Sequence, residues 1–411
     1  MANHASDDSQ TSSNEASGFS TFGGHLLAAA GDAATLGSDS QALVATLQAL
    51  GIEDAEQVVA MAAIPDVRAE LQHVLALKEK AFQQFLDRVS ALLPATRAAE
   101  YAQPGLKDRG LGAKLPTPEM LAELSAAEAA PQEGAPVGLP TSVNLVSFFN
   151  PIRSQGSRGT CVSYTLTALN EYIKRRTGLV RDLSEQHLYY EIKLVDGAAA
   201  SCGTWQVKAV PALSARGQCR EAVWPYLNAL PCNNHGPVPA SARPDGLSYR
   251  LATLAVPARN VAQYKLQMSR QRPVTISIPV YNSWYASAAV RTTGRITMRI
   301  GNEAVIGGHA VILVGYVDTA SSPGGGYFIV RNSWGTTGFG SACPFGAGYG
   351  TIPYQYITND CYEAYTAVVP GINSVMDEDQ GTNEDSGDGQ TKASTVTIQV
   401  GSNVKITIET R

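Results

Sequence analysis

Apolar residues in the first third of the chain recur at helical spacing. The residues that mark the first helix are Leu43, Leu47 and Leu50. A longer amphipathic pattern covers residues 67–93 and stops at Pro94, because proline has no N–H with which to continue a helix. The pattern predicts a small helical domain over residues 38–103 whose longest helix is the last.

The segments on either side of this domain have no sustained period. Residues 1–37 are rich in Ser, Asp, Gly and Ala, which predicts a disordered tail. Residues 104–138 are rich in proline and glycine around one short helix rich in Ala and Glu. This composition predicts an exposed connector, and exposed connectors are preferred sites of proteolytic cleavage.

The pattern after residue 138 is mixed. An apolar-periodic stretch begins at Cys161 and predicts a helix to about Arg176. Residues 274–278 alternate between apolar and polar, and residues 310–315 form a continuous apolar run typical of a strand buried on both faces. Residues 327–331 are the expected neighbouring strand. These patterns predict an α+β fold in which a helical part precedes a β-rich part.

The end of the chain changes composition again. Residues 372–393 are acidic and of low complexity, which predicts a solvated linker. In residues 394–411 two short alternating segments flank Gly401-Ser402-Asn403, which predicts a β-hairpin. Because an isolated hairpin is marginally stable in water, we expect it to dock on the rest of the chain, on another subunit or on an export partner.

Charge and hydropathy exclude several classes of protein. The formal net charge of −5 argues against a broad nucleic-acid or anionic-membrane footprint. No apolar run reaches the length of about 18 residues that a spanning helix needs. The N-terminus lacks the basic and apolar regions of a secretory signal. We therefore expect a cytoplasmic protein or one exported by a signal-independent route.

The chain has six cysteines. Proximity in sequence makes Cys219/Cys232 and Cys343/Cys361 candidate disulfides, and buried thiols are the alternative. The spacing of Cys232 and His235 resembles that of zinc ligands, but a second closely spaced pair is missing. We therefore expect no metal and no cofactor.

The strongest sequence signal for a reactive side chain lies at Cys161. A polar, glycine-containing loop, residues 155–160, runs into this cysteine, and the predicted helix starts there. The unpaired N–H groups and partial positive charge at a helix N-terminus favour thiolate over thiol. Cys161 is therefore the candidate nucleophile.

A thiolate nucleophile needs a base and an orienting group. Of six histidines, His309 is the one in a suggestive setting, because it precedes the buried apolar run. The amide oxygen of Asn332 can accept a hydrogen bond from one ring nitrogen and fix the tautomer. The side-chain amide of Gln155 and the N–H of Cys161 can together form an oxyanion hole.

These residues resemble the papain-like cysteine peptidases. The motifs that carry the resemblance, in the order of that family, are Gln155-Gly156-Ser157 with Cys161, Leu183-Ser184-Glu185-Gln186, Trp224-Pro225-Tyr226, Gly308-His309-Ala310-Val311 and Arg331-Asn332-Ser333-Trp334-Gly335. His309 lies 148 residues and Asn332 171 residues after Cys161, against a family spacing of about 130–150. The Asn lies somewhat beyond that range, which a longer loop at residues 321–326 accommodates.

The resemblance implies a two-lobe papain-like fold over residues 139–371, with one helical lobe and one β-barrel-like lobe. Cys161 would lie on the helical side of a cleft, and His309 and Asn332 on the β side. The resemblance also implies substrate-binding residues, namely Gly203, Thr204, Trp205, Gly308, Ala310 and Trp334. Trp334 would shield the contact between His309 and Asn332 from water.

The function that the resemblance implies is that of a cysteine endopeptidase made as a zymogen. Its helical domain would be a prosegment that covers the cleft, and its partners would be peptide or protein substrates. Arg158, Val162 and Gly308 depart from the usual residues of the family, which indicates a divergent branch of bacterial type. The alternatives are acyl transfer in the maturation of a partner protein, and a non-catalytic papain-like binding module.

Overall fold

The computed structural model describes residues 40–104, 109–122, 138–228, 230–231, 236–368, 395–399 and 405–409. The chain divides into two compact units, Met1–Gly371 and Ile372–Arg411. Every residue with predicted chemistry belongs to the first unit. The predicted zinc spacing at Cys232 and His235 lies outside the described residues.

The first unit opens with a group of short helices. They are α2 (Ser40–Ala49), α3 (Ala55–Ala62), α4 (Pro65–Val74), α5 (Glu79–Ala91) and α6 (Ala95–Tyr101). Gly51 follows α2 with a φ of 75°, a conformation that few other residues adopt, and the chain turns there toward α3. Asp54 caps α3 by accepting from the N–H of Gln57, whose side chain binds back to the cap.

The predicted single helix over residues 67–93 is wrong. The chain breaks between α4 and α5, where Ala76 has a φ of 53°. The break folds the two helices so that Leu71 and Phe82, both fully buried, enter one core. The apolar period continues through the break, so the pattern alone gives no sign of it.

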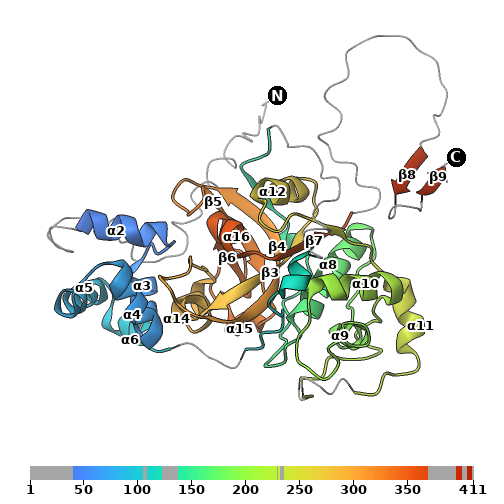
Figure 1. Cartoon of the computed structure of the whole chain (residues 1–411), viewed down its shortest axis with the longest axis horizontal. Coiled ribbons are helices and arrows are strands. Elements are labelled where there is room, and N and C mark those ends of the chain that lie inside the picture. Colours follow the sequence, from blue (N-terminus) through green and yellow to red (C-terminus); the bar gives the residue numbers. More distant parts are fainter. Residues whose placement is uncertain are drawn as a thin grey trace, which may run out of the picture. The chain divides into compact units, whose positions relative to one another are not determined.

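The helical region shares its core with the β-rich part of the unit. Ala286, Ala288, Ala289 and Ile300 of that part are buried in the same apolar cluster as the helices, and Figure 1 shows α14 (Ala288–Thr293) beside them. Arg295 adds an ion pair that is nearly excluded from water, with its Nη1 2.6 Å from Asp54 Oδ2 and its Nη2 3.0 Å from Glu53 Oε2. The helices are therefore anchored by both apolar burial and buried charge.

The helical lobe surrounds one buried helix. Its helices are α8 (Cys161–Arg176), α9 (Glu185–Lys193), α10 (Gln206–Arg216), α11 (Ala242–Gly246) and the short η3 (Leu247–Tyr249). Thirteen consecutive residues of α8, from Cys161 to Ile173, are buried. The predicted end of α8 at Arg176 is confirmed. Ser184 caps α9 by accepting from the N–H of His187.

The second lobe is built on an antiparallel sheet in the order β2-β7-β3-β4-β5-β6, with β1 also paired to β4. The strands are β1 (Ser142–Asn144), β2 (Leu254–Ala255), β3 (Val274–Tyr281), β4 (Val305–Asp318), β5 (Gly326–Arg331), β6 (Tyr349–Pro353) and β7 (Glu363–Thr366). Its short helices are η2 (Val146–Phe148), α12 (Val261–Ser269), α13 (Asn282–Tyr285), α15 (Gly335–Gly338) and α16 (Tyr354–Asp360).

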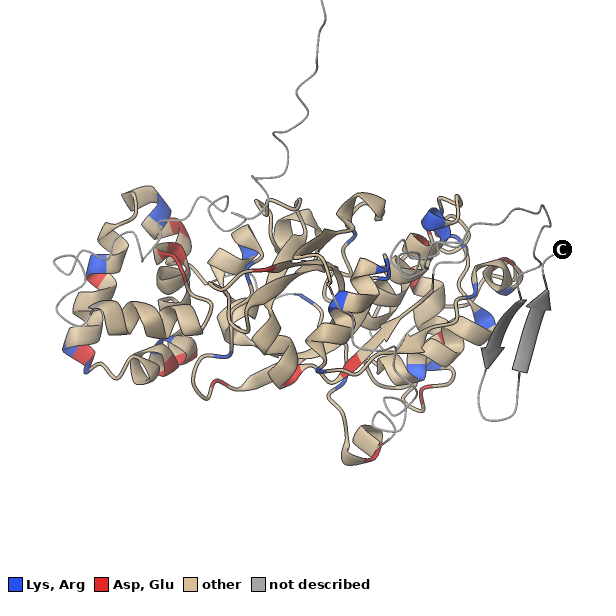
Figure 2. Ribbon diagram, turned by 90° about the horizontal axis from the view of Figure 1, so that it is seen from above, with Lys and Arg blue, Asp and Glu red and all other residues tan. Residues whose placement is uncertain are grey.

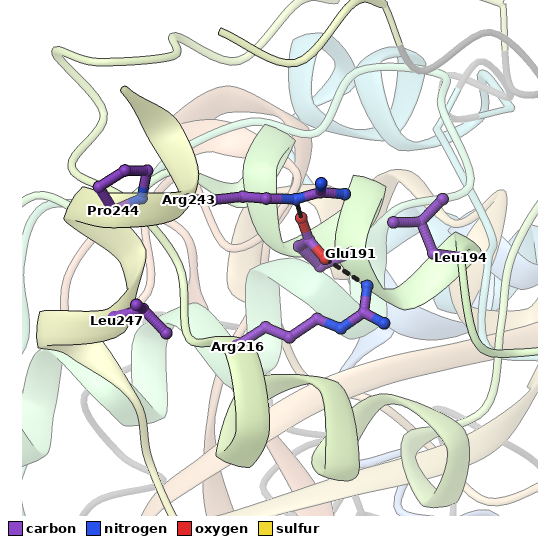
Figure 3. Close-up of a pocket in the computed structure, with 6 residues that line it drawn as sticks. All are labelled: Glu191, Leu194, Arg216, Arg243, Pro244 and Leu247. Atoms are coloured by element: carbon purple, nitrogen blue, oxygen red, sulfur yellow. Dashed lines mark hydrogen bonds and ion pairs between the residues drawn. The ribbon is translucent and has the colours of Figure 1, made fainter. Parts of the chain in front are cut away.

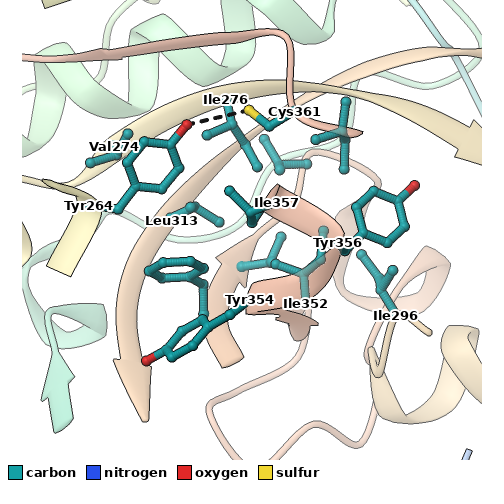
Figure 4. Close-up of a cluster of buried hydrophobic side chains, with 14 of the residues drawn as sticks. Tyr264, Val274, Ile276, Ile296, Leu313, Ile352, Tyr354, Tyr356, Ile357 and Cys361 are labelled. Atoms are coloured by element: carbon teal, nitrogen blue, oxygen red, sulfur yellow. Dashed lines mark hydrogen bonds between the residues drawn. The ribbon is translucent and has the colours of Figure 1, made fainter. Parts of the chain in front are cut away.

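The sheet encloses an extensive apolar core, part of which Figure 4 shows. Tyr264 from α12 and Ile357 from α16 pack there against Ile276 and Leu313 of the two central strands. The predicted pairing of the apolar run with residues 327–331 is confirmed, because Ile312 lies opposite Arg331. The predicted α+β architecture, with a helical lobe and a β-rich lobe, is likewise confirmed.

The second unit contains the predicted hairpin. Strands β8 (Thr395–Gln399) and β9 (Lys405–Glu409) are antiparallel, with Val396 opposite Ile408. The two strands lie where the sequence alternates between apolar and polar residues.

The two candidate disulfides do not form, and the alternative of buried thiols holds for three of these cysteines. Cys219, Cys343 and Cys361 are buried thiols, so neither Cys219/Cys232 nor Cys343/Cys361 forms. Closeness in sequence does not bring two sulfurs to bonding geometry, which depends on the fold. Cys202, which had no predicted partner, is disulfide-bonded.

The surface agrees with the modest net charge. Basic and acidic residues are interspersed over the helices at both ends of the first unit (Figure 2). Among the residues that the structure describes, no helix is long and apolar enough to cross a membrane.

Candidate active site

Cys161 is the first residue of the buried helix α8 and is completely excluded from water. Strand β4 packs against this end of the helix. The backbone N–H of Ala310 on β4 points at the Cys161 sulfur, with N and Sγ 3.4 Å apart. The fold thus places the residue after His309 directly against the candidate nucleophile.

The hydrogen bonds of Asn332 fix the tautomer of His309. The Oδ1 of Asn332 lies 2.7 Å from the backbone nitrogen of Ser333 and 2.8 Å from Nε2 of His309. Because the Ser333 N–H can only donate, the atom facing it is an oxygen, and His309 Nε2 must carry the proton that this oxygen accepts. Neutral His309 therefore has an unprotonated Nδ1, which makes no hydrogen bond with the described residues.

Trp334 stacks on His309. Their ring centroids are 4.6 Å apart and the planes are inclined by 28°. The fully buried Trp284 packs against both rings, with its centroid 5.6 Å from that of Trp334 and 6.4 Å from that of His309. The imidazole is therefore held in a dry aromatic environment, with its one N–H committed to Asn332.

Gln155 lies beside the same group. The hydroxyl of Ser333 donates to its Oε1 at 2.6 Å, which orients the amide. Its Nε2 then donates to the carbonyl oxygens of Arg158, at 2.7 Å, and of Gly110, at 3.1 Å. The predicted oxyanion donor is present, but a carbonyl of the N-terminal part of the chain occupies it.

That carbonyl belongs to residues 109–115, which we call the covering segment. The N–H of Gly110 donates to the carbonyl of Gly156 at 2.9 Å. Further on, the N–H of Thr204 donates to the carbonyl of Gly112 at 2.8 Å, and that of Lys114 donates to the carbonyl of Thr204 at 2.9 Å. The segment thus pairs in parallel with the chain at Thr204 and crosses the candidate site.

Two glycines allow this close approach. A Cβ on Gly110 would lie 2.0 Å from the carbonyl oxygen of Arg158, and one on Gly112 would lie 2.2 Å from that of Gly159. A Cβ on Gly308, which precedes His309, would lie 2.1 Å from the carbonyl oxygen of Ala113. Backbone packs on backbone at all three positions, so only glycine fits.

The covering segment is not placed for attack by Cys161. The carbonyl of Gly110 faces Gln155 and also accepts a hydrogen bond from Nε1 of Trp334 at 3.2 Å. The groups of the segment that point at the sulfur are the N–H groups of Gly112 and Ala113. Attack needs one peptide group whose carbonyl carbon lies at the sulfur while its oxygen lies at the oxyanion donors. In the covering segment the carbonyl at Gln155 and the groups at the sulfur belong to different residues.

The expectation of an exposed connector over 104–138 is therefore wrong for residues 109–113, of which all but the partly buried Leu111 are buried. Pattern analysis overlooked this segment and the residues that bind it, Tyr285 and Tyr362. The available signal was the pair of glycines at 110 and 112, which indicates close approach of another backbone or a ligand.

The six predicted substrate-binding residues all lie around the sulfur or the covering segment. Thr204, Gly308, Ala310 and Trp334 make the contacts given above. A Cβ on Gly203 would lie 2.5 Å from the carbonyl oxygen of Gly112. Nε1 of Trp205 donates to the carbonyl of Leu115 at 3.1 Å, and its ring lies 4.7 Å from the Lys114 ammonium.

Burial shifts both candidate catalytic groups toward their neutral forms. It raises the pKa of Cys161 to about 11, although N–H groups that point at the sulfur oppose the shift. Burial also lowers the pKa of His309 to about 4. The hydrogen bond from His309 to Asn332 opposes this shift, and the positive charge of Arg109 adds a little to it. The covered site therefore holds a thiol and a neutral imidazole at neutral pH.

Acidification is expected to loosen the covering segment. The pKa of His309 lies below its ordinary 6.5 when the segment covers it. Protonation of His309 therefore favours the open form, and the covered form loses stability as the pH falls from 6.5 toward about 4. Each unit of pKa difference corresponds to about 1.4 kcal/mol. Hydrogen exchange of the amides of residues 110–114 in a Cys161→Ala chain, corrected for intrinsic rates, should show less protection at about pH 5 than at about pH 7.5.

The control for this measurement is the same chain with His309→Gln, which has no imidazole to protonate. Its protection should change little between the two pH values, and amides of the β3–β4 pair provide an internal reference. Equal protection of the covering segment at both pH values with His309 present would contradict the expectation.

A separate open pocket of about 640 Å³ lies on the helical lobe, lined by residues of α9, α10, α11 and η3 (Figure 3). Arg216 and Arg243 both bind the buried carboxylate of Glu191, at 2.7 and 2.8 Å. Burial alone would raise the pKa of Glu191, but the hydrogen bonds from His187, Arg243 and Arg216 lower it to about 2. Both arginines are thus bound to Glu191, and these ion pairs join α9, α10 and α11.

Comparison with known proteins gives consistent matches. A family model described as papain family cysteine protease matches residues 139–364. Cathepsin K of Gallus gallus is 28% identical over 194 residues, 46% of this chain and 52% of the relative. Peptidase 1 of Euroglyphus maynei is 30% identical over 207 residues, 49% of this chain and 59% of the relative.

Among solved structures, xylellain, a cysteine protease from Xylella fastidiosa, is 21% identical with a TM-score of 0.49, and the match covers 64% of this chain and 97% of that one. The chain spans about half the length of the curated relatives it matches, 52% of the first and 59% of the mite peptidase.

Proposed function

The chain belongs to the papain family of cysteine proteases, and from this premise we propose that it hydrolyses peptide bonds through Cys161 and is made as a zymogen. The observation that carries the proposal is the tautomer of His309. The amide oxygen of Asn332 holds the proton on Nε2 and leaves Nδ1 free to act as a base. A histidine that served only packing would not need this arrangement beside a buried cysteine at a helix N-terminus.

The reaction follows from the groups present. Nδ1 of His309 takes the proton of Cys161, and the sulfur attacks the carbonyl carbon of the scissile peptide. The side-chain amide of Gln155 and the N–H of Cys161 stabilise the charge that develops on the carbonyl oxygen. His309 then gives its proton to the leaving amine, the C–N bond breaks and a thioester remains.

Water completes the cycle. His309 removes a proton from a water molecule, which attacks the thioester carbon and releases the carboxylic acid product. The sulfur leaves as thiolate and regains its proton from His309. Asn332 keeps the imidazole in one orientation throughout, and Trp334 limits the access of water to their hydrogen bond.

The zymogen part of the proposal rests on the covering segment. It occupies the amide of Gln155, crosses the Cys161 sulfur and presents no carbonyl for attack. The helices α2–α6 anchor it from the N-terminal side through the core that they share with α14. Residues 38–103 and the covering segment are thus assigned the role of an inhibitory prosegment, with cleavage in the chain between residue 115 and the start of the papain-like domain.

The test is activation of the full chain. Purified protein is incubated with reductant at mildly acid and at neutral pH, with and without a thiol-reactive epoxide. Intact mass should show loss of an N-terminal fragment that ends between residues 116 and 138, and hydrolysis of a denatured protein substrate should appear with it. The epoxide should block both and should be found on Cys161. A chain that becomes processed, binds the epoxide at another cysteine and still hydrolyses the substrate would refute the assignment.

A further inference from the structure

Arg109, at the start of the covering segment, is buried in a subsite suited to a cation. Its guanidinium carbon lies 4.8 Å from the ring centroid of Trp334 and 5.4 Å from that of Tyr285. Its Nη2 donates to the backbone carbonyl of Tyr285 at 2.8 Å, and its Nη1 donates to that of Gly338. Ring faces and carbonyl oxygens all present negative charge density to the guanidinium.

The side chain stays charged in this place. Burial lowers the pKa of Arg109 to about 10, Tyr285 opposes this shift and the positive charge of nearby Arg291 adds to it. The side chain is therefore still protonated at neutral pH, and the subsite holds a cation that is 9% exposed.

Tyr285 also holds the backbone of Arg109. Its hydroxyl donates to the Arg109 carbonyl at 2.7 Å and accepts from the Arg109 N–H, with 3.2 Å between the atoms. A hydroxyl can both donate and accept, so a chain running in the opposite direction would exchange the two bonds without losing either. The subsite therefore does not depend on the direction of the chain that enters it.

The position of His309 tells which side of the scissile bond this subsite serves. In the proposed reaction His309 protonates the leaving amine, so the leaving part of the substrate passes His309. Trp334 stacks on His309 and forms one wall of the subsite. The covering segment pairs with Thr204 at its other end, beyond the sulfur. The subsite thus lies on the side of the leaving group.

We infer that the subsite formed by Trp334, Tyr285 and the Gly338 carbonyl selects protein substrates with an arginine within two residues after the scissile bond. This inference rests on the proposed function and adds a substrate class to it. In the zymogen Arg109 occupies the subsite, so the covering segment blocks the selective position as well as the nucleophile.

The test compares matched peptides on the wild-type enzyme after it has processed itself. Internally quenched peptides differ only in carrying arginine or citrulline at the first or the second residue after the scissile bond. Citrulline keeps the shape and most N–H donors of arginine but has no charge. At one of the two positions kcat/KM should be about tenfold higher for arginine, in line with a desolvated cation over two rings.

Variants then locate the effect. In Tyr285→Leu one ring is lost, and the ratio of arginine to citrulline should fall to about twofold or less, whatever happens to the overall rate. Trp205→Leu, at the opposite end of the covering segment, should keep the wild-type ratio. If wild-type enzyme hydrolyses the arginine and citrulline peptides equally well at both positions, the inference is wrong while the proposed function stands. If it hydrolyses no peptide, both fall together.

Discussion

Replacing Cys161 with alanine is expected to abolish self-processing and to lower peptide hydrolysis by about 10⁴-fold or more, the scale on which loss of a catalytic nucleophile reduces turnover. The remaining groups, Gln155 and His309, have no sulfur through which to form a thioester. The fold should persist, because the change removes one buried sulfur atom and no hydrogen bond of Asn332 or Gln155. Intact mass after incubation with reductant and initial rates on a quenched peptide provide the measurement.

The matched control is Cys343→Ala. Cys343 is also a buried thiol, and burial raises its pKa to about 12, but it lies outside the group around His309. This variant should process and hydrolyse as the wild type does. Similar losses in the two variants would show that a damaged core, rather than a missing nucleophile, explains the result, and retention of activity in Cys161→Ala would refute the mechanism.

A second large effect is expected from Gly112→Ala, which should open the site without touching any predicted catalytic group. The new Cβ would lie 2.2 Å from the carbonyl oxygen of Gly159, so the covering segment cannot keep its path there. We expect the substitution to destabilise the covered form relative to the open form by about 2 kcal/mol, which is within the range of strongly disruptive substitutions. The fraction of molecules with an open site would then rise by about 30-fold. Peptide mapping of Cys161 alkylation by iodoacetamide at neutral pH, followed from the first minutes, measures this fraction.

Leu115→Ala is the control within the same segment. The Leu115 side chain is exposed, and the contact of this residue with Trp205 is made by its carbonyl. Its alkylation rate should stay close to that of the wild type. If Gly112→Ala also alkylates at the wild-type rate, the covering segment does not control access to Cys161 in solution, and its inhibitory role would have to be abandoned.

The elements around the candidate site were predictable from the sequence because their signals are local. Ser184, a residue type that favours helix N-caps, marks the start of α9. The candidate catalytic residues could be chosen from their residue types and neighbouring sequence before any distance was known. They are Gln155, Cys161, His309 and Asn332. Their convergence depends on β4 and β5 being neighbours, which the two apolar runs also indicated.

The apolar and polar pattern of the sequence could not predict contacts between residues that are far apart in the chain. The pairing of Gly112 with Thr204 joins positions 92 residues apart, and a run of proline and glycine says only that no regular element forms there. The break at Ala76 was hidden because both helices face one core and the apolar period continues through it. The disulfide of Cys202 and the cation subsite at Arg109 likewise depend on which surfaces the fold brings together.

The core that α2–α6 share with α14, together with the ion pairs of Arg295, has a consequence for the cleaved protein. A cut after the covering segment removes a covalent bond but none of these contacts, so the site opens only when the fragment dissociates as a separate chain. Before the cut its effective concentration at the site is set by the linker, and afterwards by the actual protein concentration. Specific activity should then rise on dilution, and the processed material would behave as a dissociating two-chain complex.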